Sequence, residues 1–257
     1  MQWKTSIPAV DRSLLVEDAA KLMPDPIRRQ FLRGAASVGA LAFLTGCDII
    51  DGDTAESVLR KVSEFNDGAQ AAIFSRTKLA PTYPESAITR PFPFNAYYSE
   101  AEAPVVDGTT YKLEVSGLVD NRKPWTLDEL RALPQVSQIT RHVCVEGWSA
   151  IGSWQGARLS DFLERIGADT RARYVWFKCA EGYTNTIDMA SALHPQTQMT
   201  FKFDNRLLPR AYGFPMKIRI PTKLGYKNPK YVVAMEVTNT DKGGYWEDQG
   251  YNWFGGS

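Results

Sequence analysis

Hydrophobic residues downstream of residue 110 either alternate with polar ones or form short β-branched runs, and both patterns are typical of β-strands. Between these runs, apolar residues recur at helical spacing. Because the strands are interrupted by short helices without regular βαβ spacing, the pattern predicts an α+β fold with mixed β-sheets. The expected strands are residues 111–115, 136–145, 174–179, 199–203, 217–220 and 231–237.

The helices are indicated by residues that cap helix ends. Thr126 and Glu129 have the spacing of a capping box, in which each side chain bonds the backbone of the other residue. Ser160 and Asp188 are further candidate N-caps, and Gly167 is expected to end the helix that Ser160 opens. The expected helices are residues 55–65, 126–133, 160–166 and 188–193.

The first 46 residues are better interpreted as a targeting region than as part of the fold. The pair Arg28-Arg29 resembles a twin-arginine export signal, and an apolar run of eleven residues, 34–44, follows it. That run is too short to span a bilayer, which needs about 20 residues. The tetrapeptide 44–47 resembles a lipobox, which implies lipid attachment to Cys47 and an anchor at the inner membrane. The alternative is a short buried helix after a chance arginine pair.

Three regions are therefore expected: a targeting region 1–46, a tether and lead-in 47–93, and a globular domain 94–257. Because 27 residues precede Arg28, Met23 is an alternative start of translation. Prolines mark the approach to the domain, since five of the 15 lie within residues 81–104. This density prevents regular ladders and favours extended chain.

Composition excludes some classes of function. The 257 residues are 44% hydrophobic and 23% charged, which is ordinary for a globular protein. A formal net charge of +1, without a basic run, gives no basis for nucleic-acid binding. A zinc site is disfavoured because His142 and His194 are the only histidines and no Cys-x-x-Cys pair exists.

Three cysteines require separate interpretations. Cys144 ends an apolar run just before a Gly-Trp-Ser turn, which is how a strand delivers a side chain to the mouth of a site. If Cys47 carries lipid, Cys144 and Cys179 remain, and two thiols in an oxidising compartment commonly form a disulfide. The residues alone leave both interpretations open.

The segment 141–149, Arg-His-Val-Cys-Val-Glu-Gly-Trp-Ser, resembles the sulfite-oxidase-type molybdopterin oxidoreductases, in particular their methionine-sulfoxide-reductase branch. The resemblance runs from about residue 94 to 238. It implies that Cys144 ligates molybdenum in a molybdenum-molybdopterin cofactor, with one Mo per chain. Cys179 stands where the relative has a threonine that touches the cofactor, which favours a cofactor contact over a disulfide. Arg141 is a candidate for orienting an oxyanion or polarising an S=O bond, or else a surface arginine.

Further cofactor contacts are implied by two other segments. Residues 94–99 resemble the family's Asn-Asn-Phe-Tyr-Glu segment, and residues 212–230 resemble its Gly-Ala-Pro-Ile-Arg strand and Lys-Tyr-Gly-Phe-Lys loop. Lysines at 217, 223, 227 and 230 would offer cations to the cofactor phosphate, or else form a solvated basic face. The contacts implied are Asn95, Tyr98, Ser99, Tyr212, Lys217, Asn228, Pro229 and Lys230.

The function implied is two-electron oxygen-atom transfer by an exported enzyme, most directly the reduction of an S- or N-oxide that is a small molecule or protein-bound. Oxidation of sulfite with electrons passed to a cytochrome, or binding without catalysis in the cell envelope, are the alternatives. Twin-arginine export carries folded proteins and so suits a periplasmic enzyme loaded with its cofactor beforehand.

Electron supply and assembly give the last expectations. The chain has no Cys-x-x-Cys-His, no iron–sulfur cysteine cluster and no Gly-x-Gly-x-x-Gly, so a haem-b or quinone-linked membrane subunit is the expected redox partner. A monomer is expected because only about twenty residues follow Val237, too few for the dimerisation domain common in the family. Five aromatic residues in this tail either dock the partner or fold back onto the domain: Tyr245, Trp246, Tyr251, Trp253 and Phe254.

Overall fold

The computed structural model describes the backbone of residues 52–257 and side chains from Arg60 onward. The expected targeting region 1–46 and Cys47 therefore lie outside the described residues. Within the part of the chain that is described, no helix has both the length and the apolar character needed to cross a bilayer.

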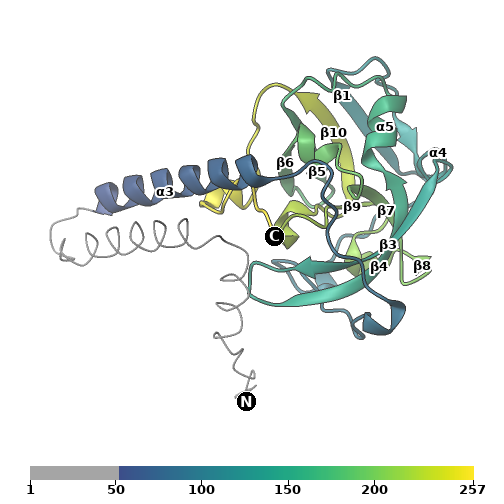
Figure 1. The fold of residues 1–257 in the computed structure, drawn as a ribbon. Helices are drawn as coiled ribbons and strands as arrows, with labels where there is room; N and C mark the ends of the chain where they lie inside the picture. The colour runs from purple at the N-terminus through teal and green to yellow at the C-terminus, as the bar shows by residue number, and fades with distance from the viewer. Residues whose placement is uncertain (1–51) are drawn as a thin grey trace. The chain divides into compact units, whose positions relative to one another are not determined.

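The first of two β-sheets is mixed (Figure 1). Its central strands β1 and β10 run parallel, with Val115 opposite Met235, and the other neighbours run antiparallel. The mixed sheet confirms the α+β prediction. Its five strands, in spatial order, are β2 (Trp125–Thr126), β1 (Lys112–Gly117), β10 (Val232–Thr238), β5 (Tyr174–Cys179) and β6 (Thr184–Asp188).

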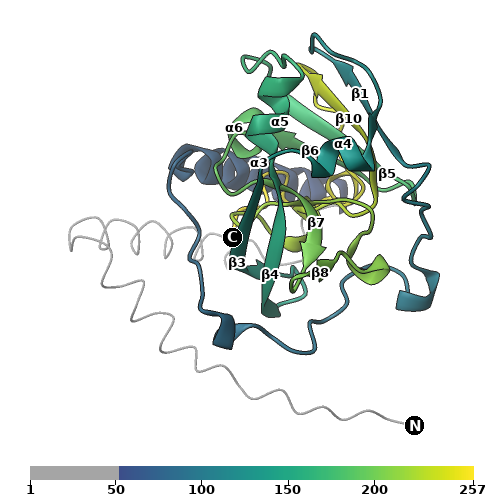
Figure 2. The same cartoon turned by 90° about the vertical axis from the view of Figure 1, so that its right-hand side faces the viewer.

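The second sheet is built on a long antiparallel hairpin, which Figure 2 shows in its labels β3 and β4. The pairing runs without interruption from Gln135 opposite Ala157 to Val143 opposite Ser149. Cys144 is thus the first residue beyond the ladder. The strands of this sheet are β3 (Gln135–Val143), β4 (Ser149–Arg158), β7 (Gln198–Phe203) and β8 (Arg206–Leu207), with β9 (Lys217–Arg219) paired to β7.

Short helices connect the strands, and two of the predicted caps are confirmed. The Thr126 hydroxyl accepts the backbone N–H of Glu129, whose carboxylate accepts the N–H of Thr126. Asp188 accepts the N–H of Ser191 at 2.8 Å. The α-helices are α3 (Gly52–Ile73), α4 (Leu127–Arg131), α5 (Leu159–Arg165) and α6 (Met189–Ala192). The 3-10 helices are η1 (Glu85–Ala87), η2 (Glu100–Glu102), η3 (Arg210–Tyr212), η4 (Gly225–Lys227) and η5 (Glu247–Gln249).

Two helix boundaries were wrong. Ser160 does not cap α5, because the helix already begins at Leu159, whose N–H donates to Thr197 O at 2.9 Å. Helix α3 runs to Ile73 rather than to residue 65. Its last turns are held by contacts to the C-terminal tail, described below, which a local pattern does not contain.

Four strands were missed. Strands β2 and β8 have only two residues each, too few to form a pattern. Strands β4 and β6 were missed for other physical reasons. Glycine lowers the strand propensity of β4. Yet Gly156 is required there, because a Cβ atom would lie 1.9 Å from Met199 O of the neighbouring strand. Strand β6 is polar because its buried side chains bind the tail: Asn185 donates to Glu247 and Thr186 to Gly243 O.

The main hydrophobic core draws on both sheets and on α5, with Val175, Phe162 and Phe201 almost fully buried. A smaller aromatic cluster around Phe92 and Trp154 lies separately. Residues Leu59 to Ser257 form one compact unit. The end of β3 carries Cys144 out of this framework into a pocket.

Candidate active site

Cys144 is positioned by the turn that joins β3 to β4. Its N–H donates to Trp148 O at 2.9 Å, and its carbonyl accepts the N–H of Gly147 at 3.2 Å. Gly147 has a φ of 91°, a left-handed conformation that glycine adopts without strain. The Gly-Trp-Ser turn therefore holds the thiol at a fixed place beyond the strand.

The Cys144 thiol is 5% exposed and free. Asn95 donates to its sulfur from Nδ2 at 3.3 Å, and Glu146 Oε2 lies 3.6 Å from the sulfur. Burial raises the pKa of this thiol, so it is protonated in the absence of a bound cation. Cys179 is also free, so the disulfide interpretation is wrong for these two cysteines.

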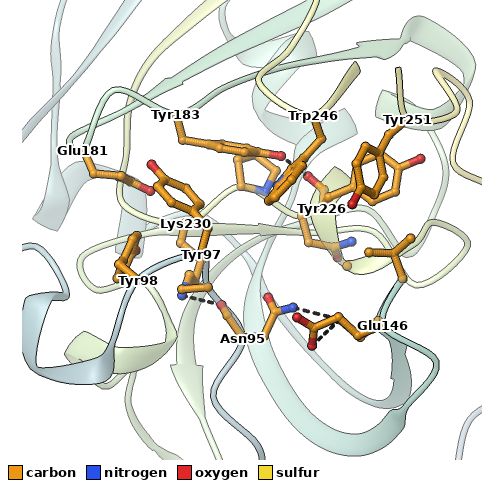
Figure 3. A pocket seen from close by; sticks show the side chains of 16 residues that line it. Asn95, Tyr97, Tyr98, Glu146, Glu181, Tyr183, Tyr226, Lys230, Trp246 and Tyr251 are labelled. Carbon is orange, nitrogen blue, oxygen red and sulfur yellow. Dashed lines mark hydrogen bonds between the residues drawn. The ribbon is translucent and has the colours of Figure 1, made fainter. Parts of the chain in front are cut away.

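A pocket opens in front of Cys144 (Figure 3). Its wall on one side consists of aromatic rings, and Asn95 and Glu146 lie on the opposite side. Six residues expected at the site line it: Asn95, Tyr98, Cys144, Asn228, Pro229 and Lys230. The remaining lining residues are Ala96, Tyr97, Val145, Glu146, Glu181, Tyr183, Gly225, Tyr226, Trp246 and Tyr251.

Lys230 lines this pocket and joins its Asn95 segment to the 3-10 helix η3. Its ammonium donates to Asn95 O at 2.8 Å and to Ala211 O at 3.3 Å. Desolvation lowers its pKa to about 8. Asn228 is different, because its amide is used within the protein: Oδ1 accepts from Arg219 and from Ile220 N, and Nδ2 donates to Leu224 O. Asn228 therefore shapes the loop rather than offering its amide to a ligand.

Four of the expected residues do not line the pocket. Ser99 is exposed and binds Glu102 at the start of η2. The Tyr212 hydroxyl donates to Phe92 O at 2.7 Å within the aromatic cluster. Cys179 is packed in the main core, and burial raises its pKa well above the usual value. Lys217 is buried with its ammonium 5.1 Å from the centre of the Trp154 ring.

Arg141 also lies outside this pocket. It is exposed on β3, its guanidinium is 5.3 Å from the ring centre of Tyr83, and it lines a different cavity. Neighbouring His142 is 1% exposed. Because successive strand residues point to opposite faces, an odd offset of three from Cys144 directs Arg141 away from the thiol's side of the strand. The structure thus does not bring Arg141 to Cys144.

Three cations, Lys217, Arg219 and Lys230, form a cationic cluster around His142. Burial is the main cause that lowers the pKa of His142 well below its usual value, and the three positive charges lower it further. Burial lowers the pKa of Lys217 strongly and that of Arg219 to about 9. None of the three forms an ion pair with another described residue. Glu181 and Glu100 act on Lys230 only beyond ion-pair distance. A positive cluster without ion pairs is suited to an anionic ligand.

Lys223 and Lys227, expected to face a phosphate or solvent, instead hold the C-terminal tail. Lys223 is 2% exposed, donates to Phe254 O at 2.8 Å and lies 3.4 Å from Asp188. Lys227 donates to Glu247 and, at 3.0 Å, to Thr186 O. The tail is therefore folded back onto the domain, which is one of the two interpretations of its aromatic residues.

The site residues that the sequence did not identify come mainly from this tail and from the turns. Trp246 and Tyr251 line the pocket with ring centres 4.9 Å apart. In the sequence, the only signal for Glu146 is its place two residues after Cys144. In the structure, its carboxylate accepts a hydrogen bond from Trp148 Nε1 at 2.8 Å. Glu181 follows β5, its Oε2 is buried without a hydrogen-bond partner among the described residues, and burial raises its pKa to about 7.

These features fit a molybdopterin-type cofactor. A free thiol faces the pocket, the cationic cluster forms no ion pair with a described residue, and the buried hydroxyl of Tyr98 has no hydrogen-bond partner among the described residues. No described group of three or more His, Cys, Asp or Glu side chains could hold a metal ion. The pocket therefore provides one protein ligand, the sulfur of Cys144, for a metal whose other ligands belong to the cofactor.

The chain matches the family described as oxidoreductase molybdopterin binding domain over residues 100–246. It is 59% identical over 241 residues to a protein of Azospira oryzae provisionally named protein-methionine-sulfoxide reductase subunit YedZ1, a match that covers 94% of this chain and 92% of that protein. It is 28% identical to the protein-methionine-sulfoxide reductase catalytic subunit MsrP of Ralstonia nicotianae, over 56% of this chain and 49% of that protein.

Sulfane dehydrogenase SoxCD of Paracoccus pantotrophus has a similar structure, with a TM-score of 0.51 at 16% identity, over 54% of this chain and 40% of that chain. This likeness shows the fold alone. The family match and the sequence identities confirm the resemblance inferred from the Cys144 segment. The chain belongs to the sulfite-oxidase-type family of molybdopterin-binding oxidoreductases.

Proposed function

We propose that this oxidoreductase reduces sulfoxides, with methionine sulfoxide in proteins as its substrate. The observation that carries the proposal is the 59% identity, across nearly the whole chain, to a relative named for that activity. The pocket supports it, because thioethers and aromatic rings attract one another and five tyrosines and a tryptophan line the cavity.

Cys144 is proposed to ligate the molybdenum, and Lys230, Asn95 and Tyr98 to contact the pterin. Lys217 and Arg219, buried near His142 in the same cationic cluster, are proposed to balance the charge of an anionic cofactor. When bound, a molybdenum-molybdopterin cofactor supplies the two-electron transfer of one oxygen atom. The thiolate is a soft ligand, which suits a metal that changes oxidation state.

The protein supplies protons and exclusion of water. Reduction of a sulfoxide takes up two electrons and two protons and releases a thioether and water. Glu181 lines the pocket with a pKa raised to about 7 by desolvation, so it can hold a proton at Oε2 near neutral pH. The aromatic wall keeps one side of the cavity apolar.

Location and partners are part of the same proposal. The twin-arginine pair and the lipobox-like sequence at Cys47 support export to the periplasm and an anchor at the inner membrane. A haem-b or quinone-linked membrane subunit is proposed to deliver the electrons. The cofactor is proposed to be present once per chain, and the domain to begin near residue 94.

A substrate panel tests the proposal. Purified, cofactor-loaded protein should oxidise reduced viologen dye with an oxidised methionine-rich protein or dimethyl sulfoxide, and should contain about one molybdenum per chain. Sulfite with ferricyanide is the comparison reaction. Turnover with sulfite and none with any sulfoxide would replace the proposal by sulfite oxidation, and a protein without molybdenum would contradict both.

A further inference from the structure

Helix α3 has an unusual orientation of its polar and apolar faces. The residues that attach it to the domain are mostly polar: Asp67 accepts the N–H groups of Trp253 and Phe254, and Gln70 accepts that of Gly256. Phe74, just after the helix, adds one ring contact to Phe254. Figure 1 shows α3 beside the C-terminal segment, in agreement with these contacts. The face at positions 67, 70 and 74 is thus the attached face.

A stripe of the helix surface outside the attached face is apolar and exposed. Val62 is 50% exposed, Phe65 75% and Ile73 83%, and Ala69 is exposed between them. At about 100° per residue these four positions fall within a stripe roughly 80° wide. An amphipathic helix normally buries its apolar stripe in the protein, so an exposed stripe indicates a surface that another apolar phase covers.

The sequence just before α3 decides what covers it. The apolar run 34–44 and the lipobox-like Cys47 lie directly upstream, and Cys47 is five residues from Gly52, the first residue of α3. Five residues span at most about 18 Å. A lipid on Cys47 would therefore keep this helix within reach of the membrane surface, where amphipathic helices lie with their apolar face in the lipid.

A second copy of the chain is a weaker match for the stripe. Positions 62, 65, 69 and 73 extend over less than two heptads, whereas a recognisable coiled coil needs three or four. We propose that the stripe Val62, Phe65, Ala69 and Ile73 of α3 lies in the interfacial region of a lipid bilayer and orients the domain on the membrane. The choice of lipid as the occupant depends on the proposed anchor at Cys47. The exposed stripe itself is observed in the structure and does not depend on that anchor.

The proposal is tested by a cysteine scan of the full chain, lipid-modified and reconstituted into phosphatidylethanolamine–phosphatidylglycerol vesicles. Single variants Val62→Cys, Phe65→Cys, Ala69→Cys and Ile73→Cys are labelled with a polarity-sensitive fluorophore. Glu64→Cys and Ala71→Cys are the controls, because they lie on neither the stripe nor the attached face. The unsubstituted protein corrects for labelling of Cys144 and Cys179.

The stripe positions should shift to blue emission and be quenched by brominated lipid, with a period of about 3.6 residues, and the controls should not. Equal, water-like emission at all six positions would overturn the proposal. A blue shift that appears without vesicles and grows with protein concentration would also overturn it, because it indicates a dimer. A blue shift that requires a co-reconstituted membrane subunit would overturn it as well. Mass spectrometry of Cys47 in the same samples shows separately whether the anchor exists.

Discussion

Lys230 connects the pocket segment at Asn95 to Ala211, 116 residues further along the chain, since its ammonium binds the carbonyls of both residues. Lys230→Met removes both bonds and a positive charge that faces the proposed cofactor. Hydrogen bonds to charged groups contribute about 1.5–3 kcal/mol, so cofactor retention should fall roughly 10- to 100-fold. The measurement is molybdenum and pterin content after dialysis. Lys178→Met, an exposed lysine of β5, is the matched control, and equal losses in both variants would contradict this role.

Single residues show what the sequence could predict at the site. Cys144 was identifiable because an apolar run, a thiol and a Gly-Trp-Ser turn are adjacent in the chain. Asn95, Tyr98 and Lys230 followed only from the family resemblance. Of the two interpretations of Arg141, the structure shows the surface arginine, since its odd offset from Cys144 along the strand directs the two side chains to opposite faces. Trp246 and Tyr251 could not be assigned, since they reach the pocket through tail contacts between residues distant in sequence, such as Lys227 with Glu247 and Thr186 with Gly243.

At the scale of elements, the β4–β7 contact depends on the absence of a side chain at Gly156. A Cβ atom there would lie 1.9 Å from Met199 O, so Gly156→Ala must push the strands apart. We expect a loss of about 3 kcal/mol in the free energy of unfolding, measured with urea. Gly68→Ala in α3 has no atom within 4 Å of the new carbon and should instead stabilise by about 0.5–1 kcal/mol. If both variants behaved alike, this view of the strand contact would be wrong.

The tail is fixed by the ion pair of Lys227 and Glu247, in which the side chains are 1% and 5% exposed. Glu247→Gln leaves the buried ammonium without its anion, which costs about 3–5 kcal/mol. The double variant Lys227→Met/Glu247→Gln removes both charges and should recover part of that loss. Urea unfolding of the two variants and the parent checks this. A double variant less stable than Glu247→Gln would mean that the pair does not act as an isolated charge couple.

Helices and strands were predicted correctly where their sequence signals are local. Strand β1 and the capped helices α4 and α6 were predicted because their signals are local: alternation of polar and apolar residues in β1, and a cap three residues from its partner in the two helices. Strands β4 and β6 were missed because Gly156 and Thr186 are explained only by their neighbours in space, Met199 and Gly243.

For the whole molecule, the buried lysines predict a pH dependence of stability. Desolvation lowers the pKa of Lys223 to about 7 and that of Lys230 to about 8, against about 10.4 in the unfolded chain. Between these values the unfolded state binds more protons, so the cofactor-free protein should gain stability from pH 7 to pH 9. Each lysine contributes a slope of at most about 1.4 kcal/mol per pH unit.

Urea unfolding of the cofactor-free protein at pH 7, 8 and 9 measures this slope. Lys223→Met should reduce it, and Lys178→Met should not. Bound cofactor should flatten the part due to Lys230, because a nearby anion raises the pKa of the lysine. Stability that fell over this range in the unsubstituted protein would contradict the assignment.

The most direct test of the proposed centre is molybdenum K-edge X-ray absorption on the purified, cofactor-loaded protein and two matched variants. Cys144→Ser should either lose one sulfur neighbour of the metal or lose the metal, while remaining folded. Cys179→Ser, at the other buried free thiol, should keep both the metal and the full sulfur count. An unchanged sulfur count at molybdenum in Cys144→Ser, or a loss confined to Cys179→Ser, would contradict ligation by Cys144.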